Sequence, residues 1–143
     1  MAGARRQATV TFSVPFADVD AMQVVWHGNY LKYFDLARDQ LFRNAGLDLY
    51  RMVEENRVVF PITRTQTKHI RPLRFRDEVK CTATLVEAEC RLVLDFEVRL
   101  AGSDQLCAKG RTEQAAVRLP EGALELRIPE PIRRALGTVG DGG

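Results

Sequence analysis

The sequence predicts a single α+β domain in which one long helix packs against an antiparallel sheet. Its 143 residues suit one domain and can bury a core without disulfides or metal ions. One amphipathic helical segment follows a first strand-like segment, and mostly strand-like segments come after it. The apolar stripe of the helix and the apolar face of the sheet can cover each other. We expect this domain to span residues 1–136, with a disordered tail at 137–143.

The long helix is predicted over residues 28–45, where apolar residues recur at spacings of three and four. The stripe consists of Tyr30, Phe34, Ala37, Leu41 and Ala45. Asn29 is the expected N-cap, with His27 as a competing boundary, and Gly46 supplies the left-handed residue that ends the helix. A shorter helical segment is expected over residues 49–56.

Five segments are predicted as strands because apolar and polar side chains alternate in them or β-branched residues are frequent. They are residues 9–16, 58–70, 79–89, 91–101 and 105–119. Pro15 marks the end of the first strand or an edge position, and Pro72 marks a turn or bulge after the second. The four strands after the helix are expected to follow one another as hairpins, giving a five-stranded antiparallel sheet.

The composition indicates a soluble globular protein, with 45% hydrophobic and 28% charged residues. A net charge of +2 is too small to indicate a nucleic-acid partner. No apolar segment approaches the length of a membrane-spanning helix, and the first residues lack the apolar region of a signal peptide. Cys81, Cys90 and Cys107 are odd in number and widely spaced, which favours reduced thiols in the core. We therefore expect a cytoplasmic protein without membrane insertion.

Asp18 and Asp20 stand one residue apart just before the long helix. A carboxylate in such a loop is usually solvated or complements the helix dipole. Beside an apolar segment, however, desolvation makes a carboxylate a better base, and the unpaired N–H groups of a helix start can receive an oxyanion. An acid with an oxyanion hole is the minimum equipment for acyl transfer. Asp20 and Asp18 are therefore candidate site residues.

The other polar candidates carry weaker signals. His27 could be a base, a ligand contact or a cap, and neither it nor His69 has metal-ligand spacing, so no metal is predicted. A basic stretch contains Arg64, Lys68, Arg71, Arg74 and Arg76. Such a stretch is usually a solvated face, and the alternative is a phosphate site. The chain has no GxSxG motif and no Gly-rich phosphate loop, which disfavours a serine hydrolase or a nucleotide-dependent enzyme.

The segment FADVDAMQVVWHGNY, residues 16–30, and the following YFDLARDQLFR resemble the hotdog-fold acyl-CoA thioesterases of the 4-hydroxybenzoyl-CoA thioesterase family. Within that family the chain is similar to the bacterial branch associated with the Tol–Pal system. The shared pattern is an aromatic residue, Asp-x-Asp, a short bend, an apolar pair, aromatic-His and Asn-Tyr. The resemblance covers about residues 9–119. Family members usually carry glycine in the bend, where this chain has Ala21, Met22 and Gln23, so Gln23 is expected either to tolerate strain or to reshape the entrance to the site.

The resemblance implies a hotdog fold and a homodimer or homotetramer with its active site at the subunit interface. It implies hydrolysis of an acyl-CoA to a carboxylic acid and CoA, with Asp20 as general base or nucleophile. The backbone N–H groups of His27 and adjacent Gly28 would bind the oxyanion. Substrate contacts are expected from Asp18, Met22, Tyr30, Arg64, Lys68, Arg71 and Arg74. CoA is part of the substrate, so no separate cofactor is implied.

Two alternatives stay open on the same fold. One is an enoyl-CoA hydratase or dehydratase, which resembles other hotdog enzymes that pair an acid with a histidine across four residues. Six residues separate Asp20 from His27, which disfavours this reaction. The other is a non-catalytic acyl-binding dimer in which the aspartates are structural. The acyl group itself, aromatic or aliphatic, short or long, is not predicted.

Overall fold

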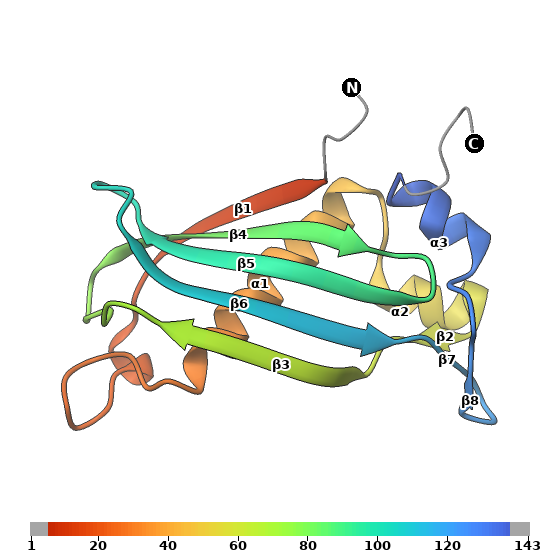
Figure 1. The fold of residues 1–143 in the computed structure, drawn as a ribbon, viewed down its shortest axis with the longest axis horizontal. Coiled ribbons are helices and arrows are strands. Elements are labelled where there is room, and N and C mark those ends of the chain that lie inside the picture. The colour runs from red at the N-terminus through yellow and green to blue at the C-terminus, as the bar shows by residue number, and fades with distance from the viewer. Residues whose placement is uncertain (1–5, 138–143) are drawn as a thin grey trace.

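The computed structural model describes residues 6–137 and shows an antiparallel sheet with one long helix across one of its faces (Figure 1). The sheet contains β1 (Gln7–Ser13), β4 (Glu78–Glu87), β5 (Arg91–Leu100), β6 (Leu106–Ala115) and β3 (Ile62–His69), in that spatial order. The predicted α+β class, the five-stranded sheet and the single domain are therefore confirmed. The predicted disordered tail lies, apart from Gly137, outside the described residues.

The order of the strands differs from the prediction at β3. Strands β4, β5 and β6 form consecutive hairpins as expected, but β3 pairs with β6, with Lys68 opposite Lys109, and not with β4. The prediction of four strands in hairpin succession is therefore wrong for the first of them. A hairpin loop has two to five residues, whereas residues 70–77 form a longer connection that reaches past two strands. Strand β3 consequently lies at an edge of the sheet.

Two of the predicted strands are interrupted. Pro61 has no N–H to donate to a strand ladder, and the predicted strand 58–70 is divided at this point. The predicted strand 105–119 is likewise divided at Ala116. The separated pieces form a small second sheet of β2 (Val58–Val59), β7 (Val117–Arg118) and β8 (Ala123–Leu124), of which β8 was not predicted.

Helix α1 (Asn29–Asn44) has the predicted position and ends at Gly46, which has the expected positive φ of 77°. The residue before it, Gly28, is the N-cap, and no side chain caps the helix. The prediction that Asn29 caps the helix is wrong. Its side-chain N–H instead donates to the backbone oxygen of Asp18 at 2.9 Å, which joins the preceding loop to the helix.

Short helical segments complete the chain. The predicted segment 49–56 is α2 (Leu49–Arg51) continued by a π-helical turn, η2 (Met52–Asn56). Asp48 caps it, because its side chain accepts hydrogen bonds from the N–H groups of Tyr50 and Arg51. A 3-10 turn, η1 (Phe16–Asp18), follows β1, and α3 (Glu130–Ala135) lies near the C-terminal end.

The core lies between α1 and the sheet. Tyr30, Phe34, Ala37 and Leu41 of the predicted helix stripe are buried there, and α1 packs mainly on β1 and β4. The Phe34 ring stacks on Phe96 of β5 with 4.5 Å between the ring centroids. The cysteines are all free, and Cys81 and Cys107 are buried as expected, but the core placement predicted for Cys90 is wrong because it is exposed in the β4–β5 turn.

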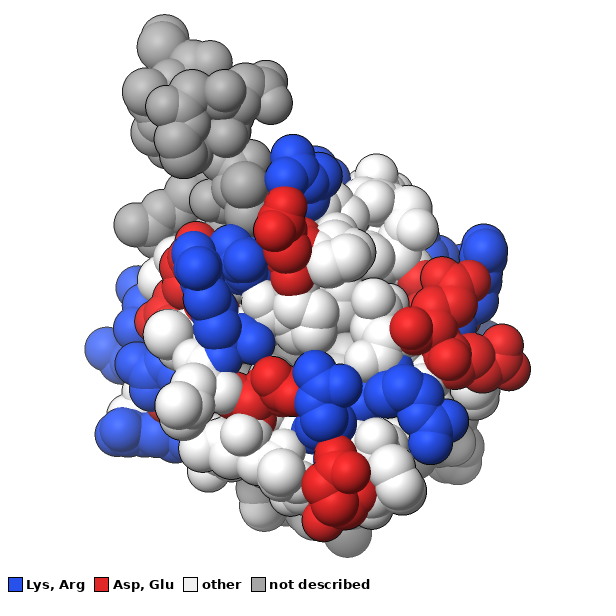
Figure 2. Space-filling view, turned by 90° about the vertical axis from the view of Figure 1, so that its right-hand side faces the viewer, with Lys and Arg blue, Asp and Glu red and all other residues white. Residues whose placement is uncertain are grey.

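Charges of both signs are interspersed on the end of the molecule that carries α2, the small sheet and α3 (Figure 2). Ion pairs there include Arg51–Glu55, Arg118–Glu125 and Arg127–Glu89. This face shows no large patch of a single sign. Among the described residues, no helix combines the length and the apolar character needed to cross a membrane.

Gly110 of β6 lets the Phe34 ring lie directly on the sheet. A Cβ added at Gly110 would lie 2.3 Å from that ring, which is fully buried and stacked on Phe96 and therefore cannot move aside freely. We expect Gly110→Ala to lower the free energy of unfolding by about 1–3 kcal/mol through overpacking. Urea denaturation measures this change. Gly102→Ala is the matched control, since nothing lies near its Cβ position, and an equal effect of both variants would contradict the explanation.

Candidate active site

A three-residue hairpin loop carries Asp20 to the start of α1. The Asp20 N–H donates to the Val24 oxygen, and the Gln23 N–H donates to the Asp20 oxygen, both at 2.9 Å. In hairpin loops of this length the third loop residue adopts the left-handed conformation, which favours glycine. That residue here is Gln23, with a φ of 66°. The strain expected at Gln23 from the sequence is therefore present.

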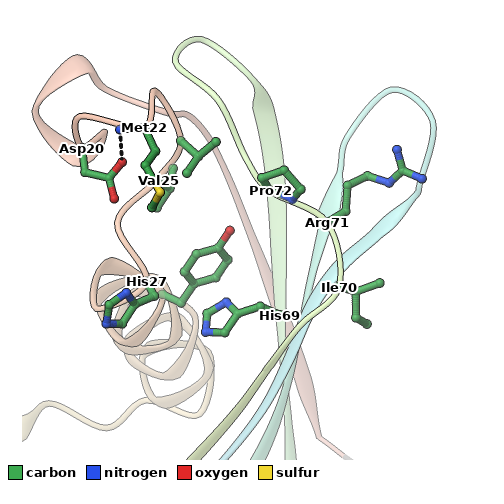
Figure 3. A pocket seen from close by; sticks show the side chains of 10 residues that line it. Asp20, Met22, Val25, His27, His69, Ile70, Arg71 and Pro72 are labelled. Atoms are coloured by element: carbon green, nitrogen blue, oxygen red, sulfur yellow. Dashed lines mark hydrogen bonds between the residues drawn. The ribbon is translucent and has the colours of Figure 1, made fainter.

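The Asp20 carboxylate faces a cavity of about 260 Å³ between this loop, the start of α1 and the end of β3 (Figure 3). It is partly buried, and its Oδ1 accepts a hydrogen bond of 2.9 Å from the Met22 N–H, which fixes the side chain in an Asx-type turn. Other residues that line the cavity are Met22, Val25, His27, Tyr30, His69 and Ile70.

Two backbone N–H groups are unpaired where α1 begins. Within residues 6–137, the N–H groups of His27 and Gly28 have no hydrogen-bond acceptor, whereas the N–H groups of Trp26 and Asn29 on either side do. His27 lines the Asp20 cavity. The Trp26 ring lies so close over Gly28 that a Cβ there would be 2.2 Å from it. The helix start therefore offers two free donors, strengthened by the helix dipole, beside the carboxylate.

Asp18 is the buried member of the pair, with 4% of its surface exposed. Its Oδ2 accepts a hydrogen bond from the Tyr33 hydroxyl at 2.7 Å, and its Oδ1 pairs with Lys32 at 2.5 Å. Burial, and next to it the hydrogen bond to Asp18, raise the pKa of Tyr33. Asp18 does not line the cavity. Its contacts orient the loop relative to α1, and its predicted role in substrate binding stays a prediction.

His69 lines the Asp20 cavity although the sequence did not single it out as a site residue. It is the last residue of β3, and its ring centroid lies 4.8 Å from Tyr30 and 6.5 Å from His27. Tyr30 is buried, and this burial raises the pKa of its hydroxyl. No sequence signal identifies His69, because its proximity depends on where β3 ends relative to α1.

The predicted basic contacts are scattered in a single chain. Arg71 lines the cavity, but its guanidinium is directed away from Asp20 (Figure 3). Lys68 and Arg64 pair with residues of β6 whose side chains lie on the sheet face opposite α1. Arg74 lies in the turn before β4, where its N–H donates to Asp77. Contacts of these residues with CoA phosphates stay predictions.

No group of three or more His, Cys, Asp or Glu side chains in the described part of the chain is arranged to hold a metal ion. The absence of a metal from the reaction stays a prediction.

The left-handed conformation of Gln23 generates a test of the loop. We expect Gln23→Gly to raise the free energy of unfolding by about 0.5–1 kcal/mol, because glycine adopts a positive φ without the clash of a Cβ. Thermal or urea denaturation measures the difference. Gln23→Ala is the control, since it removes the same side chain but keeps the Cβ. A glycine variant no more stable than the alanine variant would contradict this account.

Comparison with known proteins supplies the family. The family model of the thioesterase-like superfamily matches residues 14–136. The 1,4-dihydroxy-2-naphthoyl-CoA hydrolase of Thermosynechococcus vestitus is 27% identical over 121 residues, which are 84% of this chain and 82% of the relative. An acyl-CoA thioesterase of Haemophilus influenzae is 26% identical over 112 residues, 76% of this chain and 82% of that protein.

Solved structures agree with the fold. The 1,4-dihydroxy-2-naphthoyl-CoA thioesterase from Synechocystis superposes with a TM-score of 0.84 at 23% identity and covers 93% of this chain and 97% of its own. The chain therefore belongs to the thioesterase-like superfamily, whose hotdog fold it shares, and it is a thioester hydrolase.

Proposed function

We propose that Asp20 is the reacting carboxylate in the hydrolysis of an acyl-CoA to a carboxylic acid and free CoA. One observation carries the assignment. Asp20 and His27 line the same cavity (Figure 3), and the backbone N–H groups of His27 and of adjacent Gly28 have no acceptor within residues 6–137. The names of the relatives support an acyl-CoA substrate, since both act on CoA thioesters or are called acyl-CoA thioesterases.

The reaction follows from this arrangement. The thioester oxygen accepts hydrogen bonds from the His27 and Gly28 N–H groups, which makes the carbonyl carbon more electrophilic. Asp20 then either attacks that carbon or takes a proton from a water molecule that attacks it. The C–S bond breaks, and the CoA sulfur leaves as a thiolate that receives a proton from the water. If water attacks, its oxygen becomes part of the acid directly. If Asp20 attacks, the product is an acyl–Asp20 anhydride, which water then hydrolyses to the acid and free Asp20. One donor of such an oxyanion hole contributes about 3 kcal/mol to lowering the barrier.

The surroundings of Asp20 keep its carboxylate available. Lys32, the cation nearest along α1, is paired with Asp18. Asp20 makes no ion pair within residues 6–137, and its recorded hydrogen bond, from Met22, uses only Oδ1. Apolar side chains of Val25 and Ile70 line the same cavity. The second oxygen is therefore free to act on a substrate beside these apolar side chains.

We also infer a homodimer or a larger assembly with the active site at its interface. Strand β3 is an edge strand, and α1 packs on β1 and β4, which leaves the α1-facing side of β3 uncovered. Ile62 and Ile70, at its two ends, are 45% and 48% exposed. An exposed edge readily pairs with a second copy of itself. Three free cysteines and a CoA substrate fit a cytoplasmic enzyme.

Replacing Asp20 by asparagine tests its role. Asparagine keeps the oxygen that accepts from the Met22 N–H but cannot act as a nucleophile or base. We expect kcat to fall by about 10²–10⁴-fold, measured as thiol release over a panel of acyl-CoA substrates, with the folded state preserved.

The matched control is Asp48→Asn. Asp48 Oδ1 also accepts a hydrogen bond from the N–H two residues along the chain, that of Tyr50, but Asp48 lies outside the Asp20 cavity. The Asp48→Asn variant should have the same kcat as the wild type. If the Asp20→Asn enzyme kept more than half of the wild-type kcat, Asp20 could not be the reacting carboxylate.

The oligomeric state gives a separate prediction. Light scattering should give a mass of at least two chains of 16.1 kDa, because the uncovered edge of β3 needs a partner. Specific activity should fall on dilution to concentrations at which the mass falls to that of one chain. A single-chain species with undiminished specific activity would contradict a site at the interface.

A further inference from the structure

A second cavity, of about 640 Å³, lies between α1 and the segment that contains α2 and β2. We call it the helix groove. Most of its wall is apolar, including Leu36, Phe42, Leu49, Met52, Phe60 and Ile62. Leu36, Leu49 and Ile62 are nearly half exposed, so a considerable apolar surface faces solvent in a single chain. The helix groove and the Asp20 cavity share no lining residue.

Two buried side chains that line the helix groove, those of Arg38 and Gln114, each have one buried polar atom without a partner. Arg38 and Gln114 are only 9% and 6% exposed, and within residues 6–137 neither Arg38 Nε nor Gln114 Oε1 has a hydrogen-bond partner. The other ends of both side chains are fixed. Arg38 Nη1 donates to Asp35 at 2.6 Å, and Gln114 Nε2 donates to the Phe60 oxygen at 2.8 Å. Native proteins rarely leave buried polar atoms unpaired, which indicates that a ligand supplies the partners.

We propose that the helix groove holds the acyl group of the substrate whose thioester is bound at Asp20 of the partner subunit, and that Arg38 and Gln114 recognise a hydroxyl on this acyl group. The proposal rests on the function proposed above. It assigns the two side chains a role in substrate specificity.

The chemistry of the two free atoms selects a hydroxyl. Arg38 Nε–H can only donate, and Gln114 Oε1 can only accept. A hydroxyl does both and is neutral. A carboxylate would be repelled by the oxygens of Gln114 and of Asp35, and Asp35 already neutralises Arg38. An ammonium group would be repelled by the Arg38 cation. A purely apolar acyl group would fill the groove but leave both atoms unpaired.

The position of the helix groove requires a second subunit. Ile62, which lines it, begins β3, and His69, which lines the Asp20 cavity, ends β3. Seven strand steps separate them by roughly 24 Å, too far for one acyl group to span. When two β3 edges pair antiparallel about a two-fold axis, the start of one strand lies beside the end of the other. The helix groove of one subunit then adjoins the Asp20 cavity of its partner.

Pairs of substrates that differ only in a hydroxyl test the recognition. The probes are benzoyl-CoA with its three monohydroxy isomers, and octanoyl-CoA with its terminal-hydroxy analogue. We expect the wild type to prefer at least one hydroxylated member by about tenfold or more in kcat/KM. Arg38→Lys keeps a cation near Asp35 but puts a methylene in place of Nε–H, and Gln114→Met removes the oxygen.

In both variants, the ratio of kcat/KM for the hydroxylated member to kcat/KM for the unhydroxylated member should fall toward one. This should hold even if the variant lowers kcat/KM for both members. Arg43→Lys is the matched control, because Arg43 lies on the same helix but outside the groove, in an exposed pair with Asp39. It should leave the preference unchanged. A preference retained in both Arg38→Lys and Gln114→Met would overturn the assignment of these residues.

Mixed dimers test the sharing between subunits. The Asp20→Asn chain supplies an intact Arg38, and the Arg38→Lys chain supplies an intact Asp20. If the site is shared, adding inactive Asp20→Asn chains to Arg38→Lys chains restores the hydroxyl preference of the mixture toward that of the wild type. If each chain used its own groove, no intact site would form and the preference would stay low, which would overturn the shared site.

The remaining outcomes separate this inference from the proposed function. Equal turnover of both members of every pair would overturn the inference and leave the thioesterase mechanism standing. Absence of turnover for every probe would count against the mechanism. Calorimetry would then measure the binding of the same pairs to the Asp20→Asn variant. Tighter binding of the hydroxylated member that is lost in the Asp20→Asn, Arg38→Lys double variant would support the assignment of the helix groove. Equal affinities for both members would overturn it.

Discussion

The geometry of the site depends on one buried carboxylate, that of Asp18. Its two side-chain oxygens are held by Tyr33 and Lys32 of α1, and its backbone oxygen accepts hydrogen bonds from the Trp26 N–H and the Asn29 side chain. The loop before the helix is thus tied to the helix on both sides of Asp20. Removing a buried acceptor with several donors leaves each donor unpaired, so this contact is costly to break. It fixes where Asp20 can lie relative to the helix start.

The spacing of the two aspartates follows from the same constraint. Val19, between them, has extended backbone angles, φ −90° and ψ 147°, which alone would direct both side chains to the same side of the chain. Their different hydrogen-bond partners give them different positions. After Asp18 the chain turns into the hairpin loop, where the Met22 N–H donates a hydrogen bond to the Asp20 carboxylate. The Asp18 carboxylate therefore positions the loop, and the Asp20 carboxylate stays available to react.

Patterns in the sequence predicted the structural features that depend on residues close together in the chain. The bounds of α1 and its termination before Gly46 follow from residues within a few positions of each other, whereas the strain at Gln23 was expected from the family resemblance. The location of β3 beside β6, and with it the approach of His69 to the Asp20 cavity, could not be predicted in this way. Alternation along a strand says which face is buried but not which strand is its neighbour. The helix groove was missed for the same reason, since it joins segments distant in sequence.

Several unmet local requirements lie at or beside the two cavities. Gln23 has the conformation of a glycine, the His27 and Gly28 N–H groups lack acceptors, and Arg38 and Gln114 each keep one unpaired atom. A positive φ also occurs at Arg57, Arg76 and Asp104, outside both cavities, so the free N–H groups and the unpaired buried atoms mark the cavities better than strain does. Natural sequences accept such local conflicts where function requires them. A substrate that spans both cavities would supply acceptors to the helix start and partners to the groove, so the conflicts at its two ends have a common resolution.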